Sequence, residues 1–267
     1  MIKIAVSGAA GRMGGRNIVA VHEAEGVELS GALERPGHRM LGTDAGILAG
    51  CGMLGIKIGD NLNETVKECD VLIDFTTPKV SLKNLEVCGL FRKAIVIGST
   101  GFTAEERVLA EELAKDIPVI IAPNMSVGVN VCFKVLADIA NILGDDFDVE
   151  IVEAHHRMKK DAPSGTAVRM GEIVAGALGR DYRQVANCHR EGITGERTRE
   201  EIGMQTIRGG DIVGDHTVYF IGMGERIELT HRAHTRDMFS RGAVRAAKWV
   251  VDRKPGIYDM QDVLGLR

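Results

Sequence analysis

The stretch Ile2-Lys3-Ile4-Ala5-Val6-Ser7-Gly8-Ala9-Ala10-Gly11-Arg12-Met13-Gly14 indicates the fold of this chain. A short, mainly apolar run ends in a glycine-rich turn, and an amphipathic run begins at Arg12. Glycines at such a turn let a pyrophosphate approach the backbone N–H groups at the start of a helix. The spacing is G-x-x-G-x-x-G, with Ala9 in place of the first glycine of the commoner fingerprint. Because glycine turns also occur for structural reasons alone, the motif needs support from its surroundings.

The same alternation of strand-like and helix-like runs continues through the first half of the chain. Short apolar runs alternate with longer amphipathic runs, which is the pattern of a doubly wound parallel α/β sheet of the Rossmann type. Strands are predicted at residues 2–7, 27–33, 71–75, 94–98 and 119–122, and helices at 12–23, 79–92 and 103–115. Thr103, followed by two glutamates, is a suitable N-cap for the third of these helices.

This alternation ends near Pro123, where a turn-rich segment follows the strand predicted at 119–122. Residues 187–201 are polar and contain glycine, so we expect a long exposed loop there. The last part of the chain predicts a strand at 148–154, a helix at 164–178 capped by Ser164, antiparallel strands at 205–208, 217–221 and 226–230, and a final helix at 237–252.

The composition is that of a globular protein, with 45% apolar and 26% charged residues among 267. A net charge of −4 gives no reason to expect nucleic acid or an anionic membrane as a partner. The cysteines are dispersed without metal-ligand spacing, which predicts reduced, buried thiols and no metal site. The sequence shows no charged-then-apolar leader and no apolar run long enough to cross a membrane, so we expect a cytoplasmic protein.

Residues after later strands extend the nucleotide crevice, because open α/β sheets bind ligands at the carboxyl ends of their strands. Glu34 lies about 20 residues beyond the glycine run, where an acid bonds the adenosine ribose hydroxyls. Arg35 follows directly and suits a 2′-phosphate, with an exposed ion pair as the alternative. This pair predicts use of both NADH and NADPH. Gly98-Ser99-Thr100-Gly101 and Ala122-Pro123-Asn124-Met125 also follow strands, either as cofactor contacts or simply as turns.

A site for binding and proton transfer is indicated by residues 153–167, Glu-Ala-His-His-Arg-Met-Lys-Lys-Asp-Ala-Pro-Ser-Gly-Thr-Ala. Its cationic run leads into a helix start, where the N–H groups of Gly165 and Thr166 suit a carboxylate. Histidine exchanges a proton near neutral pH unaided, whereas lysine needs burial or neighbouring cations. The segment therefore predicts a receptor for a small polyanion beside proton donors. Arg157 and Lys160 are interpreted as solvated charge that supports this site.

Segment 153–167 resembles the signature of the 4-hydroxy-tetrahydrodipicolinate reductase (dihydrodipicolinate reductase) family of lysine and diaminopimelate biosynthesis. The resemblance covers essentially the whole chain. Further landmarks match in order at Gly8 to Gly14, Ile73-Asp74-Phe75-Thr76, Gly98 to Phe102, Asn124 to Val131, Arg208 to Gly214 and Gly242 to Ala247.

The resemblance assigns roles to particular residues. It implies that His155 is the general acid/base and Lys159 the proton donor, and that His156, Gly165 and Thr166 hold the substrate. It implies that the binding site for NADH or NADPH is lined by Gly8, Ala9, Ala10, Gly11, Arg12, Met13, Glu34, Arg35, Gly98, Ser99, Thr100, Ala122, Pro123, Asn124 and Met125.

The resemblance also implies a reaction and an architecture. The reaction is NAD(P)H-dependent reduction of 4-hydroxy-2,3,4,5-tetrahydrodipicolinate, a small cyclic dicarboxylate, to 2,3,4,5-tetrahydrodipicolinate with loss of water. A Rossmann-type dinucleotide-binding domain (1–126) is expected, joined to a smaller α+β domain for substrate binding and oligomerisation (127–237). The C-terminal helix and tail (238–267) are expected to return to the first domain. The expected assembly is a homotetramer.

Two rival functions fit the sequence less well. A nucleotide-sensing protein without turnover has no need of His155 together with Lys159, and an amino-acid dehydrogenase acting on aspartate or a related diamino acid does not need the 153–167 segment. The chain also departs from the family at three positions. Thr77 stands where many members carry an arginine near the cofactor phosphate, and Ser99 and Met125 replace the commoner Thr and Phe.

Overall fold

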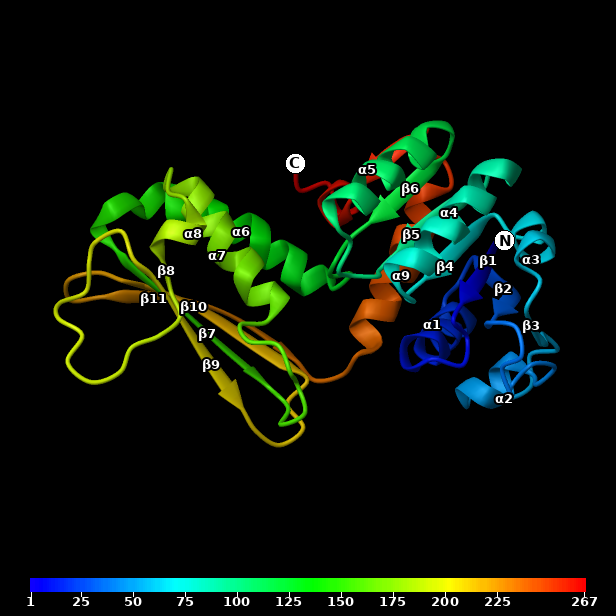
Figure 1. Cartoon of the computed structure of the whole chain (residues 1–267), viewed down its shortest axis with the longest axis horizontal. Coiled ribbons are helices and arrows are strands. Elements are labelled where there is room, and N and C mark those ends of the chain that lie inside the picture. The colour runs from blue at the N-terminus through cyan, green and yellow to red at the C-terminus, as the bar shows by residue number, and fades with distance from the viewer. The chain divides into compact units, whose positions relative to one another are not determined.

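The computed structural model describes all residues from 1 to 267 and divides into two compact units. The first unit comprises Met1–Val127 with Arg236–Arg267, and the second comprises Gly128–Thr235. Each unit has its own sheet and its own helices (Figure 1). The C-terminal segment is therefore built into the same unit as the N-terminus.

The first unit contains a seven-stranded sheet in the order β12-β6-β5-β4-β1-β2-β3. Its strands all pair in parallel, so the expected fold class is confirmed. Its strands are β1 (Ile2–Ser7), β2 (Val27–Leu33), β3 (Ile58–Gly59), β4 (Val71–Asp74), β5 (Ala94–Ile97), β6 (Pro118–Ile121) and β12 (Gly256–Tyr258).

Helices cover both faces of this sheet because successive strand residues point to opposite faces. Ile4, Ile73 and Val96 pack with α1 (Arg12–Glu23), α9 (Asp237–Val250) and α10 (Met260–Leu264). Ala5, Leu72 and Ile95 pack with α3 (Leu62–Glu68), α4 (Pro78–Phe91) and α5 (Ala104–Leu113). Thr103 caps α5 through a capping box with Glu106, as expected. The short helix α2 (Ala45–Ala49) and the 3₁₀ turn η1 (Ala114–Asp116) complete this unit.

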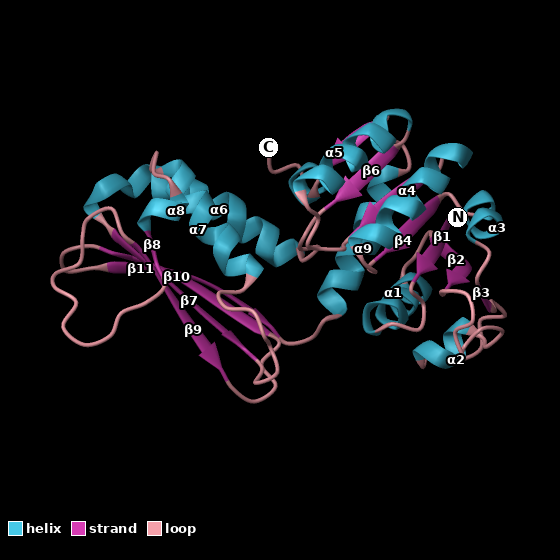
Figure 2. Ribbon diagram, in the orientation of Figure 1, coloured by secondary structure: helices cyan, strands magenta, loops and turns pink.

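The second unit contains a five-stranded sheet in the order β11-β10-β7-β9-β8. Figure 2 shows helices α6 (Val127–Leu143) and α7 (Gly165–Ala177) lying along one face of this sheet. The prediction that Gln205 to Arg208 pairs in antiparallel fashion was wrong, since β9 runs parallel to β7. The strands are β7 (Asp148–His155), β8 (Ala186–Asn187), β9 (Ile202–Arg208), β10 (Gly214–Ile221) and β11 (Arg226–Ala233), with η2 (Gly144–Asp146) and α8 (Tyr182–Val185) between them.

Helix α6 corrects an expectation from the sequence. Residues Val127–Asp146 are long and apolar enough to cross a membrane by length and composition alone, with a mean hydropathy of 1.5. The expectation that no such run exists was therefore wrong. In the structure α6 contributes Cys132, Leu136 and Ala140 to the core of the second unit, together with residues of β7, β9 and β10. Only 22% of the apolar window is buried, so this packing accounts for part of its apolar character.

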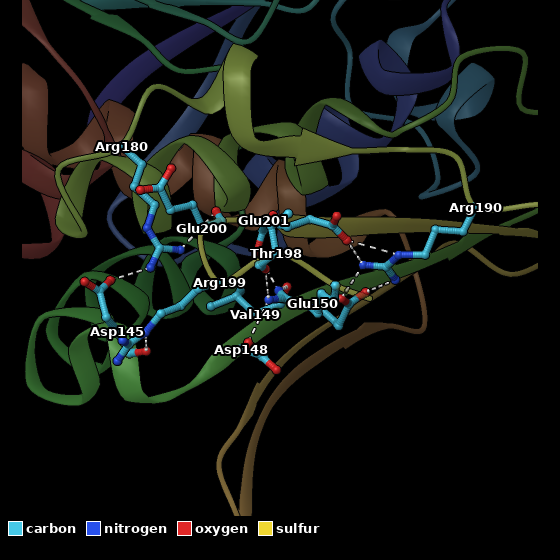
Figure 3. Close-up of polar contacts among 11 residues, drawn as sticks. Asp145, Asp148, Val149, Glu150, Arg180, Arg190, Thr198, Arg199, Glu200 and Glu201 are labelled. Carbon is cyan, nitrogen blue, oxygen red and sulfur yellow. Dashed lines mark hydrogen bonds and ion pairs between the residues drawn. The ribbon is translucent and has the colours of Figure 1, made fainter. Parts of the chain in front are cut away.

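The loop after β8 is long and mostly exposed, as expected, and arginines anchor it to the strands (Figure 3). Arg190 donates to both carboxylate oxygens of Glu150, at 2.7 and 2.8 Å, and also contacts Glu201. Gly203 makes room for this arrangement, because a Cβ there would lie 1.9 Å from Glu150 Oε2. Cys188 at the start of the loop is exposed, which contradicts the expectation of buried thiols at this position.

Candidate active site

The glycine turn after β1 brings backbone atoms unusually close together. Gly8 has a φ of +71°, which favours glycine, and a Cβ on Gly14 would lie 2.0 Å from the Gly8 carbonyl oxygen. Helix α1 can begin this near the turn only because Gly14 has no side chain. Close approach of α1 to the turn is the geometry that dinucleotide binding requires, so the residues fit a nucleotide at this place.

Glu34 and Arg35 lie just beyond β2. Glu34 Oε2 accepts the Ala10 N–H at 3.1 Å, so its carboxylate lies against the glycine turn. Its other oxygen accepts the Arg35 N–H at 3.0 Å. The Arg35 side chain is exposed and makes no ion pair within the chain, which leaves its guanidinium accessible to an anionic group.

The remaining expected cofactor residues follow β5 and β6 in the same unit. Because neighbouring strands are parallel, the ends of β1, β2, β5 and β6 lie along one edge of the sheet. Gly98 packs closely on the ring of Phe75, where a Cβ would lie 2.4 Å from two ring atoms. Ala122 and Met125 are buried at 2% and 1% exposure, and the Met125 carbonyl oxygen packs against Gly242 of α9, where a Cβ would lie 1.8 Å away.

A buried polar network under this edge was not foreseen from the sequence. Asp74, at the end of β4, is fully buried and accepts hydrogen bonds from the Thr76 backbone and hydroxyl at 2.9 and 2.6 Å. Asn84 donates to both Asp74 and Ser7, at 3.2 and 3.0 Å. Burial raises the pKa of Asp74, and these hydrogen bonds oppose the rise. The family resemblance at Ile73-Asp74-Phe75-Thr76 pointed to this segment but assigned no role to Asp74.

In the second unit, the helix-facing side of the sheet changes from apolar to polar along the strands. One row across the strands is Met204, Ile151, Val218 and Leu229, and the next row toward the end of β7 is Thr206, Glu153, His216 and His231. Glu153 is fully buried and His216 is 4% exposed. Buried polar side chains are costly unless bonded, so this row is a candidate for a functional site.

Glu153 is the most heavily bonded residue of this row. Its Oε2 lies 2.6 Å from His155 Nδ1 and 2.8 Å from Arg208 Nη1. Its Oε1 accepts from Arg208 Nη2 at 2.8 Å and from the Ser164 N–H at 3.0 Å. Burial would raise the pKa of Glu153, but the hydrogen bonds from Arg208 and His155 outweigh burial and lower that pKa to about 2.

His155 lies at the end of β7, 9% exposed. Burial lowers its pKa, and the bond to Glu153 opposes that change. Its other nitrogen, Nε2, faces Gly214, where an added Cβ would lie 3.0 Å away. The ring of His216 meets that of His155 edge to face, with centroids 5.1 Å apart. Burial lowers the pKa of His216 to about 3, so this second histidine is neutral at physiological pH.

Lys159 lies in the loop that follows β7. Its Nζ is 2.8 Å from Asp161, a partner to which sequence reasoning gave no role. The loop is held in place by backbone bonds from His156 to Ile212 and from Arg157 to Gly210. His156 is half-buried.

Helix α7 begins next to this loop, as expected. Ser164 Oγ caps it by accepting the Ala167 N–H at 3.2 Å, and the same oxygen lies 2.8 Å from His216 Nε2. Gly165 and Thr166 form the first turn of the helix, where N–H groups point away from the helix body. A Cβ on Gly165 would meet nothing within 4 Å, so this corner is open. The structure thus brings His155, Lys159, Gly165 and Thr166 to one end of the second unit.

Comparison with known proteins decides the family. Models of the dihydrodipicolinate reductase N-terminus and C-terminus match residues 2–125 and 128–264. The chain belongs to the dihydrodipicolinate reductase family. Members of this family are pyridine-nucleotide-dependent reductases, so the chain is an oxidoreductase and its first unit is a nucleotide-binding domain.

Curated relatives agree over their full length. A 4-hydroxy-tetrahydrodipicolinate reductase from Geobacter sp. (strain M21) is 80% identical over 267 residues, which are 100% of both chains. Proteins of the same name from Geotalea uraniireducens (strain Rf4) and Geobacter sulfurreducens are 80% and 76% identical, again over 100% of both chains. The whole chain, and not one unit alone, therefore corresponds to this family.

Solved structures show the same architecture. A dipicolinate-bound dihydrodipicolinate reductase from Paenisporosarcina sp. TG-14 is 25% identical, with a TM-score of 0.75 over 98% of both chains. An amine dehydrogenase from Mycobacterium smegmatis shares the fold at 14% identity, with a TM-score of 0.58 over 96% of this chain and 94% of its own. That second likeness concerns the fold alone.

Proposed function

We propose that this chain reduces 4-hydroxy-2,3,4,5-tetrahydrodipicolinate to 2,3,4,5-tetrahydrodipicolinate with loss of water, in the diaminopimelate route to lysine. The proposal is carried by one observation. His155, which is hydrogen-bonded to the buried carboxylate of Glu153, lies at the same end of the unit as Lys159 and the open corner of α7. A doubly charged ring needs both proton-exchanging groups and N–H donors. The names of the full-length relatives support the same substrate.

The first unit is proposed to hold NADH or NADPH. The glycine turn and the start of α1 receive the pyrophosphate, and Glu34 meets the ribose hydroxyls. The accessible guanidinium of Arg35 meets the 2′-phosphate of NADPH, so both cofactors are accepted. The nicotinamide half is assigned to the residues after β5 and β6, of which Thr100 and Pro123 are exposed. When bound, the cofactor supplies the hydride that reduces C4 of the ring.

The second unit is proposed to orient the ring and manage its protons. Gly165 and Thr166 bind one carboxylate through backbone N–H groups, and His156 adds a further donor. Lys159 Nζ donates the proton that the electron-rich product ring takes up, and His155 exchanges a proton through Nε2 as general acid/base. The bond between Lys159 and Asp161 keeps the ammonium group at the site while the substrate binds.

Assembly and location are also proposed. The second sheet carries helices on one face only, and its other face includes exposed apolar residues such as Ile207 and Ile221. We propose that these open faces meet in a homotetramer, which would shield them from water. Reduced cysteines and a nicotinamide-dependent biosynthetic reaction fit a cytoplasmic location.

The proposal is tested by the oxidation of NADH and NADPH in the presence of the condensation product of pyruvate and aspartate semialdehyde. Either cofactor is expected to be consumed with that substrate and not with oxaloacetate plus ammonia. His155→Gln and Lys159→Ala are each expected to lower kcat by about 10²–10⁴-fold with nearly unchanged cofactor Kd, because the cofactor binds the other unit. Turnover within a few-fold of wild type in either variant would refute that residue's role.

A further inference from the structure

Glu153 has no part in the proposed chemistry, yet it contacts both halves of the substrate site. One of its oxygens lies 2.6 Å from His155 Nδ1, and the other accepts the Ser164 N–H at 3.0 Å, next to the carboxylate-binding corner. We propose that Glu153 is a positioning residue that fixes the proton of His155 on Nδ1 and ties His155 to the start of α7. This inference rests on the proposed role of His155.

The carboxylate itself is held in a single orientation. Arg208 makes a paired contact, with Nη1 on one oxygen and Nη2 on the other, both at 2.8 Å. Thr206 Oγ1 adds a bond to Oε1 at 3.1 Å. A planar guanidinium that meets both oxygens fixes the plane of the carboxylate as well as its position. Since Glu153 is fully buried, solvent does not compete for these bonds.

The state of the histidine follows from the state of the carboxylate. Hydrogen bonds from Arg208 and His155 keep the pKa of Glu153 at about 2, so the side chain is ionised and only accepts hydrogen bonds. His155 Nδ1 must then carry the proton that it shares with Glu153. Neutral His155 has its lone pair on Nε2, the nitrogen that faces Gly214. A carboxylate partner of this kind selects the tautomer and the ring orientation of a catalytic histidine.

Other charged and titratable groups also face His155. Lys159 from the loop and Arg208 from β9 both lower its pKa, and the neutral ring of His216 from β10 meets it edge to face. Glu153 is the group that raises the pKa of His155 against these neighbours and against burial. Removal of the charge of Glu153 should therefore move the His155 titration to lower pH, by about one unit or more.

The experiment compares Glu153→Gln with Glu150→Gln in the full-length chain. Glu150 is a matched control, because it lies on the same strand and binds Arg190 through both oxygens but touches no site residue. Histidine ¹⁵N NMR of the wild-type protein is expected to show His155 protonated at Nδ1 and bare at Nε2. In Glu153→Gln we expect mixed tautomers and a kcat about 10²-fold lower. In the pH dependence of kcat/KM, the pKa assigned to His155 should be lower than in the wild type. Glu150→Gln should keep the wild-type tautomer and pH profile.

The outcomes separate the two proposals. A wild-type His155 protonated at Nε2 overturns the positioning role without any measurement of turnover, so the test holds even if Glu153→Gln fails to fold. Wild-type turnover and pH profile in Glu153→Gln also overturn it, and leave the proposed function intact provided that His155→Gln is impaired. Wild-type turnover in His155→Gln overturns the role of His155 and the positioning proposal together.

Discussion

Replacement of Gly14 by alanine should damage the nucleotide site through a contact that the structure defines. The added Cβ would lie 2.0 Å from the Gly8 carbonyl oxygen and 2.9 Å from the Ala9 Cα. Real Cβ contacts are essentially never shorter than 3.0 Å, so α1 and the turn must separate by about 1 Å. Both contacting groups are backbone, so no side-chain rotation relieves the clash, and overpacking of this kind costs about 1–3 kcal/mol. The proposed pyrophosphate site uses the same turn, so we expect cofactor Kd to rise at least about tenfold.

Gly15 provides the control for this prediction. It also lies in α1, but a Cβ there meets nothing within 4 Å. Gly15→Ala should raise stability by about 0.5–1 kcal/mol through helix propensity alone and leave cofactor binding unchanged. Titration of each variant with NADPH, followed by cofactor fluorescence, and urea unfolding measure the two effects. Equal Kd values for Gly14→Ala and Gly15→Ala would show that the tight turn is not the nucleotide site.

Further predictions concern the second unit. Gly214→Ala places a Cβ 3.0 Å from His155 Nε2, so steady-state kinetics should show kcat reduced by about tenfold with cofactor Kd unchanged; an unaltered kcat would mean that Nε2 is not used. His216 stays neutral when folded, with a pKa of about 3 against 6.5 for a free histidine, so the unfolded chain binds one more proton between these values. Stability should therefore fall as pH drops from about 6.5, by up to about 1.4 kcal/mol per pH unit. Urea unfolding of His216→Phe should show a shallower dependence, and identical slopes would contradict the assignment.

The first half of the fold was predictable because its signals are local. Strands β1 and β2 and helix α1 have the boundaries that hydrophobic periodicity and the glycine turn indicate. Helix α6 was missed because it begins directly after a turn-rich segment, although Asn130, Lys134 and Asp138 recur at helical spacing within its apolar run. The direction of β9 was mispredicted because strand pairing is set by contacts distant in sequence.

The candidate site was predictable only where its residues are neighbours in the sequence. His155, Lys159, Gly165 and Thr166 all come from one segment, whose residue types indicate a polyanion receptor. Arg208 joins Glu153 across 55 residues of chain, and periodicity carries no information about such a contact. His216 and Gly214 likewise reach His155 only through the pairing of β10 with β7.

One end of the second unit is proposed to bind a cyclic dicarboxylate through an imidazole, an ammonium group and backbone amides. A crystal structure of this chain with pyridine-2,6-dicarboxylate tests it most directly. We expect one carboxylate on the N–H groups of Gly165 and Thr166, with the ring within reach of His155 and Lys159. A ring that binds away from the start of α7 and the loop after β7 would contradict it.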